Sequence, residues 1–320
     1  LEHTAGEISK GVGFKSVTTG ETDALVDKYT DLYIKEKLGG FEDKSPRFIY
    51  LFDRLRPRVR HVVADMVREL SKSDFAPVDF ELVLGKDGQL PPMRFFDGEN
   101  ELFINGIADR VDAYLKDGKL YLRIIDYKTG KKSFSLSDIW YGMGMQMLLY
   151  LFALEQEGAQ RYGAEIVPAG VLYVPARDDL ISSNGDLSDE ELETAKAKTR
   201  RRSGLILDDA DIIAAMENSE NPEYLPVSFK RDGSLSTDAL AGHEQFKALH
   251  AHVDRRLLEL SKNLSGGKIE ASPYYRGEAD NACLYCPYLS VCRFDEKLDS
   301  RRYLSKLKPS EFWDRLEGQK

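Results

Sequence analysis

The chain has 320 residues, enough for one large domain or two modest ones, and 42% of them are hydrophobic and 31% charged, as in an ordinary globular protein. The formal net charge of −9 argues against a nonspecific basic coat on nucleic acid, but it does not exclude a metal-dependent enzyme, which gathers carboxylates around an ion. No apolar run approaches the ~20 residues that span a bilayer and no secretory leader is recognisable, so we expect a cytoplasmic protein without a membrane partner.

The first segment, residues 1–75, is predicted to be a helical lead-in. Apolar side chains recur there every three or four positions, as in the run 59–70. The chain starts at Leu1 and Glu2 without a methionine, from which we expect a fragment of a longer protein.

The second segment, residues 76–176, is predicted to be an α/β core. The run FAPVDFELVLG alternates like a strand, and LPPMRF is predicted to be a loop because Pro91 and Pro92 interrupt both helix and sheet. Residues 101–128 are strand-like with one turn signal. A helix is predicted over 137–157 and a buried strand over 169–176, which gives the order α-β-β-β-α-β.

Two further segments follow the predicted core. Residues 177–237 are polar and charged, and we predict a helical insertion with loops. Residues 238–320 are predicted to be a long helix, roughly 239–262, followed by a segment that carries all three cysteines of the chain.

A hairpin inside the core fixes the relative position of two strands. Asp117 and Gly118 lie between two strand-like runs, and this dipeptide is typical of a type I′ turn, which needs positive φ at both positions. The turn places Lys116 opposite its partner Lys119, and the same register makes Asp112 and Arg123 a cross-strand pair of opposite charge. The alternate positions form an apolar face, so the pattern supports this register.

The apolar face ends at two carboxylates. The register places Asp109 directly opposite Asp126, with Cβ atoms ~4.5–5.5 Å apart, and such a pair repels unless a proton or a cation lies between. Lys128 points to the same face. Hard cations such as Mg²⁺ bind carboxylate and carbonyl oxygens and keep several waters, so we predict a Mg²⁺ site with an ammonium beside the metal-bound water. The alternative is that Lys128 merely neutralises the carboxylate pair at a strand end.

With these residues the chain resembles the RecB-like branch of the PD-(D/E)xK nuclease superfamily. GIADRVD (106–112) matches the Gly-x-x-Asp segment of that branch, IIDYKTG (124–130) its Asp-x-Lys segment, and QMLLY (146–150) its Gln-x-x-x-Tyr helix. The order and spacing of the three motifs agree with the family. The resemblance implies a restriction-endonuclease-like core with a mixed sheet.

The resemblance also implies a role for each matching residue. Asp109 and Asp126 bind the metal together with the backbone carbonyl of Tyr127. Lys128 orients or activates the attacking water. The remaining two motif residues, Gln146 and Tyr150, line the site and help to position DNA; the alternative is that they only pack their helix. Glu81, on the strand before the hairpin, is a candidate supporting carboxylate, although a solvated position is the favoured interpretation.

The C-terminal cysteines Cys283, Cys286 and Cys292 are too closely spaced for a secreted disulfide framework. They look like the iron–sulfur staple of the AddB (RexB) family of helicase–nuclease subunits, in which three such cysteines and one far upstream hold a 4Fe–4S cluster. The alternatives are a partial zinc site with His243 or His250 as fourth ligand, or three reduced thiols.

The chain departs from the family in two ways. It lacks the family's Gly-x-x-x-His segment, and Leu1-Glu2 looks like the tail of that helix; the fourth cysteine is missing as well. We therefore expect this fragment to bind Mg²⁺ weakly, to cut DNA poorly or not at all, and to lack an intact iron–sulfur cluster.

The predicted function is that of a Mg²⁺-dependent DNA nuclease domain. By resemblance, the intact protein pairs with an AddA/RexA-type helicase–nuclease subunit, processes double-strand breaks and cuts one unwound strand. The alternatives are a stand-alone RecB-like exonuclease and a non-catalytic DNA-binding scaffold.

Overall fold

The computed structural model describes residues 1–177, 188–227 and 238–318, which form two compact units. The first unit contains Leu1–Met93, Asn105–Phe134 and Gln146–Phe246. The second contains Arg94–Ile104, Ser135–Met145 and Lys247–Lys320.

A six-stranded mixed sheet forms the centre of the first unit, with the strand order β1-β4-β5-β6-β7-β8. Its strands are β1 (Ala76–Leu84), β4 (Gly106–Lys116), β5 (Lys119–Lys128), β6 (Glu165–Pro175), β7 (Ser203–Leu207) and β8 (Leu240–Ala241). The β1–β4, β4–β5 and β6–β7 pairs are antiparallel, whereas β5–β6 and β7–β8 are parallel. The expected α/β class with a mixed sheet is confirmed.

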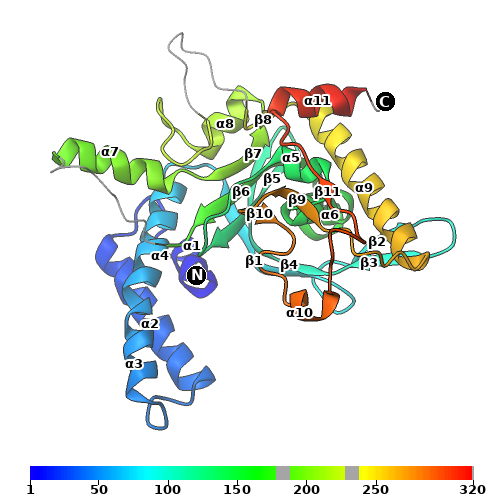
Figure 1. Cartoon of the computed structure of the whole chain (residues 1–320). Helices are drawn as coiled ribbons and strands as arrows, with labels where there is room; N and C mark the ends of the chain where they lie inside the picture. The colour runs from blue at the N-terminus through cyan, green and yellow to red at the C-terminus, as the bar shows by residue number, and fades with distance from the viewer. Residues whose placement is uncertain (178–187, 228–237, 319–320) are drawn as a thin grey trace. The chain divides into compact units, whose positions relative to one another are not determined.

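Helices cover both faces of this sheet (Figure 1), with α1, α2 and α4 on one side and α6 on the other. The helices of the first unit are α1 (Glu2–Lys10), α2 (Thr19–Lys37), α3 (Pro46–Asp53), α4 (Leu55–Ser71), α6 (Gln146–Tyr162), α7 (Asp189–Arg200) and α8 (Ala210–Met216). Thr18 caps α2, because its hydroxyl accepts from the amide of Glu21 and the Glu21 carboxylate accepts from the amide of Thr18. Four helices, α1 to α4, occupy the N-terminal segment in which helices were predicted.

One apolar cluster joins the lead-in helices to each other. Phe80 of β1 packs against this cluster. Its buried members come from α1, α2 and α4: Ala5, Val26, Val63, Met66 and Leu70. The three residues of α4 recur at helical spacing in the sequence, so this helix buries one apolar stripe against α1 and α2.

A buried ion network fixes α4 to the sheet. It consists of three arginines and three carboxylates from α4, β4, β5 and the residue before β7: Asp65, Glu69, Arg110, Asp112, Arg123 and Arg202. Arg123 Nε donates to Asp112 Oδ2 at 2.9 Å, which confirms the predicted cross-strand pair. Because the formal charges balance, each buried ion has a partner of opposite sign, as burial of charge requires.

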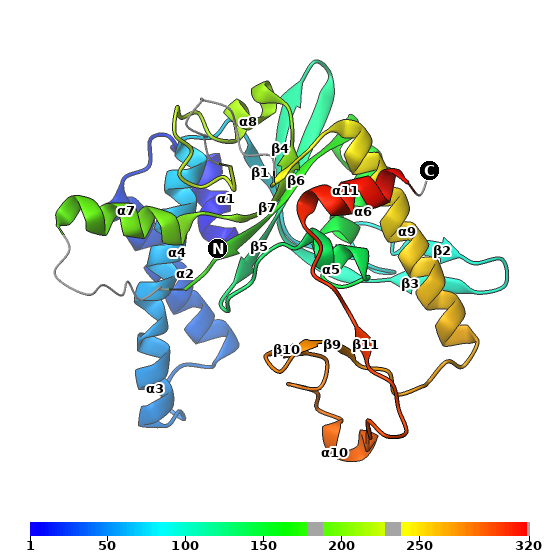
Figure 2. The ribbon, with the colours of Figure 1, turned by 45° about the horizontal axis from the view of Figure 1, so that its top comes forward.

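In the second unit, α5 (Leu136–Trp140) and α11 (Pro309–Glu317) lie side by side (Figure 2). Trp140 stacks on His252, with 5.1 Å between ring centroids, and Phe312 meets Trp140 edge-on. The elements of this unit are β2 (Met93–Phe96), β3 (Glu101–Ile104), α5 (Leu136–Trp140), α9 (His243–Ser265, whose first turn belongs to the first unit), β9 (Tyr274–Gly277), β10 (Asp280–Asn281), α10 (Leu289–Cys292), β11 (Arg302–Tyr303) and α11 (Pro309–Glu317).

Three predicted elements differ from the structure. The predicted loop LPPMRF contains β2, which pairs with β3, because Pro91 and Pro92 only precede the strand. The helix predicted over 137–157 is divided into α5 and α6, with Gly142 and Gly144 in left-handed conformations between them. The predicted insertion 177–237 contributes α7 and α8, but it also contributes β7, which pairs with β6 inside the sheet.

Across the described ranges, no helix combines the length and the hydropathy needed to cross a membrane.

Candidate metal centre at the end of the β4–β5 hairpin

The β4–β5 hairpin has the register predicted from its turn. Asp117 has φ 52° and Gly118 has φ 76°, as the type I′ turn requires, and Lys116 lies opposite Lys119. The same register continues to Arg110 opposite Ile125, so the next residue of each strand is an aspartate. The turn chemistry therefore fixes which side chains meet at the far end of the hairpin.

Asp109 and Asp126 occupy that far end, and Lys128 lies beside them. Asp126 is buried, and its Oδ2 is 2.5 Å from Lys128 Nζ. Burial raises the pKa of Asp126, and the neighbouring Asp109 carboxylate adds to the rise, although Lys128 and Lys132 act in the opposite direction. A buried carboxylate next to another carboxylate is poorly stabilised by one ammonium alone, and a divalent cation would complete the charge balance.

The backbone of Tyr127 faces this pair of carboxylates. Its amide donates to Asp109 Oδ2 at 2.9 Å. Because the amide and carbonyl of one extended residue point to the same neighbouring strand, the Tyr127 carbonyl is directed toward β4 as well. The Tyr127 hydroxyl accepts from Arg110 Nη1 at 2.5 Å, so the buried ion network anchors the residue that carries this amide and carbonyl.

Glu81 of β1 approaches the same end of the hairpin. Its φ of 48° is unusual for a non-glycine residue, and β1 pairs with β4 on either side of it, through Phe80 and Leu82. Burial raises the pKa of Glu81, and Asp109 adds to the rise. Glu81 is largely exposed, as the favoured interpretation required, but it also lies within electrostatic reach of Asp109. The sequence showed only an alternating strand, so the proximity of Glu81 had no local signal.

Gln146 and Tyr150 lie together at the start of α6. Gln146 Nε2 donates to the Tyr150 hydroxyl at 2.9 Å. Tyr150 is buried against Gly106 of β4: a Cβ at Gly106 would lie 2.4 Å from the Tyr150 hydroxyl. The glycine of the Gly-x-x-Asp segment thus provides the space that the tyrosine of the helix motif occupies, so the first and third motifs meet in the structure.

Comparison with known families agrees with this arrangement. Residues 7–293 match the family described as the PD-(D/E)XK nuclease superfamily.

The chain belongs to the PD-(D/E)XK nuclease superfamily.

Curated relatives of this nuclease-family chain are longer proteins. It is 32% identical over 99% of its length to an ATP-dependent helicase/deoxyribonuclease subunit of Thermoanaerobacter sp. (strain X514). It is 33% identical over 96% of its length to the protein of the same name from Clostridium acetobutylicum, and 30% identical over 97% to that from Alkaliphilus oremlandii. The chain spans 28% of the length of the first relative and 27% of the other two.

The three cysteines lie in the second unit, around one small cavity of about 250 Å³. Cys283 and Cys286 are half-buried, Cys292 is exposed, and none is in a disulfide. The other residues around this cavity are mostly apolar, including Pro273, Leu289 and Phe294. This surrounding is compatible with a cluster that needs thiolates and exclusion of water.

Within the described ranges, no three His, Cys, Asp or Glu side chains are already arranged to hold a metal ion. The thiols share a cavity without converging, and the hairpin supplies two carboxylates together with backbone and ammonium groups. In the described part of the chain, neither His243 nor His250, the alternative zinc ligands, forms a metal-binding group with the cysteines. The donor set at the hairpin suits Mg²⁺, which accepts few protein ligands and keeps water.

Proposed function

We propose that this chain hydrolyses phosphodiester bonds of DNA with Mg²⁺ as cofactor and water as the nucleophile. The observation that carries the proposal is the meeting of Asp109, Asp126 and Lys128 at the polar end of an otherwise apolar strand face. Membership of a nuclease superfamily supports the same chemistry. When bound, Mg²⁺ would polarise a phosphate oxygen and lower the pKa of a water ligand.

Each residue of the site has a distinct part in this proposal. Asp109, Asp126 and the carbonyl of Tyr127 would hold the ion. Lys128 would orient the attacking water and oppose the negative charge that develops on the phosphate. The Tyr127 amide, which donates to Asp109, keeps one carboxylate oriented before substrate arrives.

Gln146 and Tyr150 would position the DNA from the start of α6. Gln146 is exposed, and its amide is held by the Tyr150 hydroxyl, so it can contact substrate without a large loss of side-chain freedom. Tyr150 is buried and acts through Gln146 and Gly106.

The test is substitution of Asp126 by alanine in this chain. Asp126→Ala should abolish Mg²⁺-dependent cleavage of a labelled single-stranded oligonucleotide, because loss of a metal ligand costs several kcal/mol of transition-state stabilisation. It should also abolish the rise in melting temperature that Mg²⁺ produces by binding to the folded state, a readout that works even if turnover is slow. The matched control is Asp211→Ala, which removes an exposed partner of Lys116. Undiminished cleavage by Asp126→Ala would rule out the assigned role, and DNA binding without any cleavage by the complete protein would favour the scaffold alternative.

We further propose that the chain is part of a larger protein that works with an AddA/RexA-type helicase–nuclease subunit on broken DNA ends. The support is the name shared by the relatives, which are subunits of ATP-dependent helicase/deoxyribonucleases. This favours a component of an assembly over a stand-alone exonuclease. In the complete assembly, Asp126→Ala should stop cleavage of one unwound strand and leave unwinding intact; loss of unwinding as well would contradict the division of labour.

We also propose that Cys283, Cys286 and Cys292 are ligands of a 4Fe–4S cluster, with a fourth thiolate that is not among the three cysteines of this sequence. Thiolates in a set of four are what such a cluster requires. A longer protein that includes a further upstream cysteine should be brown, with visible absorbance that Cys286→Ser removes. A colourless extended protein would contradict the assignment.

A further inference from the structure

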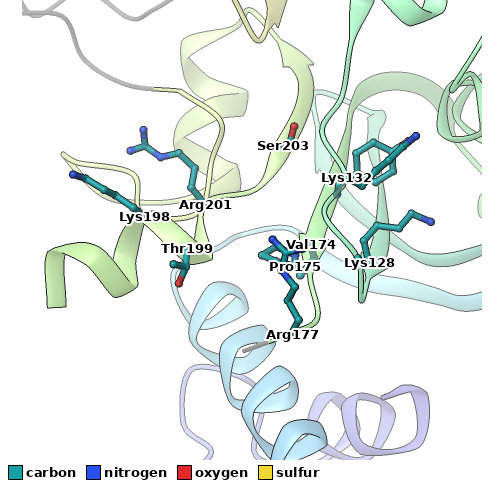
Figure 3. A pocket seen from close by; sticks show the side chains of 11 residues that line it. Lys128, Lys132, Val174, Pro175, Arg177, Lys198, Thr199, Arg201 and Ser203 are labelled. Carbon is teal, nitrogen blue, oxygen red and sulfur yellow. The ribbon is translucent and has the colours of Figure 1, made fainter. Parts of the chain in front are cut away.

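A basic pocket adjoins the metal centre in the first unit (Figure 3). Its volume is about 340 Å³, and it lies among the ends of β5 and β6, the C-terminal turn of α7 and the start of β7. Lys128, which contacts Asp126, also lines this pocket. The pocket and the metal centre therefore share Lys128.

The residues around the pocket have an unusual charge for this protein. Of its described lining residues, none is Asp or Glu, and five are cationic: Lys128, Lys132, Arg177, Lys198 and Arg201. The whole chain has a formal net charge of −9. A local concentration of positive charge on an acidic protein attracts an anion to that place and leaves the remaining surface repulsive to it.

The positions of these charges indicate the shape of the anion. Figure 3 shows Lys128 and Lys132 on one side of the pocket, Lys198 and Arg201 on the opposite side, and Val174 and Pro175 between them. In this view the charged ends of Lys128 and Lys132 point to one side and those of Lys198 and Arg201 to the other, so these four ends do not converge on one point. A single phosphate ion would need convergent groups, whereas successive phosphates of one backbone can contact cationic groups that lie apart.

The size of the pocket argues for one strand. Its volume is near the lower limit of roughly 300 Å³ for pockets that hold a drug-sized molecule, which leaves room for about one nucleotide between the two walls. A duplex carries a second backbone, for which a pocket of this size has no room.

We propose that the basic pocket binds the sugar–phosphate backbone of a single DNA strand next to the bond that is cleaved, with Lys198 and Arg201 contacting phosphates on the side away from the carboxylates. This inference rests on the proposed nuclease function for the position of the cleaved bond. The part of the chain that follows β6 thus supplies the strand-binding wall of the site as well as a strand of the sheet. No base-specific contact is implied, because phosphate contacts position a strand without reading its sequence.

The experiment measures binding separately from cleavage. Fluorescence anisotropy with a labelled single-stranded oligonucleotide in EDTA, at several salt concentrations, compares this chain with Lys198→Ala, Arg201→Ala and the double variant. Both side chains are exposed, and circular dichroism checks that the variants fold. Lys196→Ala is the matched control, because Lys196 lies on the same helix but does not line the pocket.

Each substitution should weaken binding about fivefold at 0.1 M salt, because one phosphate contact to a single strand contributes a slope of roughly 0.7 in log affinity against log salt. The double variant should lower the slope by about 1.4, and Lys196→Ala should leave it unchanged. Wild-type affinity and slope in the double variant would overturn the proposal, and equal binding and equal losses with a duplex would overturn the single-strand assignment. Asp126→Ala should still bind in EDTA; if it also still cleaves with Mg²⁺, the proposed function fails while the binding result stands separately.

Discussion

Glu69 of α4 gives a quantitative test of how the sheet below the metal centre is held. Its carboxylate accepts from Arg123 Nη2 at 3.1 Å and from Arg202 Nη2 at 3.0 Å. Burial by itself raises the pKa of Glu69, but Arg202, Arg110 and Arg123 outweigh burial and hold the pKa at about 2, against an ordinary value of 4.5. Glu69 is therefore charged in the folded protein at every pH well above its folded-state pKa of about 2.

The contribution of Glu69 to stability follows from the difference between its pKa in the folded and in the unfolded protein. A carboxylate whose pKa is lowered by folding stabilises the fold above its unfolded-state pKa, and this stabilisation is lost as the pH falls from 4.5 through about 2. Roughly 2.5 pKa units at about 1.36 kcal/mol each correspond to about 3 kcal/mol. Glu69→Gln leaves three buried arginines facing two carboxylates, and removal of one member of a buried ion pair costs about 3–5 kcal/mol.

We expect Glu69→Gln to lower the free energy of unfolding by about 3 kcal/mol at pH 7, and the melting temperature by roughly 6–12 °C for a unit of this size. Unfolding is followed by circular dichroism between pH 3 and pH 8. The control is Glu165→Gln, which loses an exposed ion pair with Lys119 and should cost at most about 1 kcal/mol. If Glu69→Gln were as stable as the control, with a pH dependence parallel to the wild type, the network would not be holding α4 to the sheet.

Three further predictions concern the metal centre and the cysteine segment. Asp126→Asn should raise the melting temperature in EDTA at pH 7 and remove the rise caused by Mg²⁺, because burial and Asp109 raise the pKa of Asp126 and disfavour its charged form; a lower melting temperature in calorimetry would contradict this. Gly106→Ala should reduce both stability and cleavage, because the new methyl group would lie 2.4 Å from the Tyr150 hydroxyl, and adding Tyr150→Ala should restore part of the stability; the absence of any rescue would place the strain elsewhere. In this chain the thiol of Cys286 should react readily with a thiol reagent under native conditions, since it is half-buried and unpaired in a disulfide; protection equal to that of a core thiol would count against it.

Local chemistry was sufficient to predict the hairpin at the centre of the site. Asp117 and Gly118 specify a type I′ turn, and a strand alternates its side chains with a period of two, so the turn alone determines that Asp109 and Asp126 reach the same end of the hairpin. The helix α4 was predictable for a similar reason, because it buries a stripe of apolar residues at helical spacing that includes Val63, Met66 and Leu70.

The tertiary structure decided what no local pattern encodes. Residues 203–207 are a short apolar run inside a polar segment, and only the open edge of β6 makes them the strand β7. Glu81 follows the alternation of β1, but its approach to Asp109 depends on the pairing of β1 with β4. Gly142 and Gly144 divide a continuous helical pattern because the chain changes from one compact unit to the other between them and Gln146.

The basic pocket shows the same division between sequence and structure. The motif lysine, Lys128, was recognisable from its position two residues after Asp126. Lys198 and Arg201 lie about 70 residues farther along, in a charged run that resembles any solvated helix, and nothing local relates them to the site. They line the same pocket as Lys128 because β6 pairs with β5 in parallel and β7 returns antiparallel beside β6, which brings the end of α7 to the carboxyl ends of both strands. Long-range strand pairing, which depends on the burial of whole faces and not on neighbouring residues, decides which distant charges share a site.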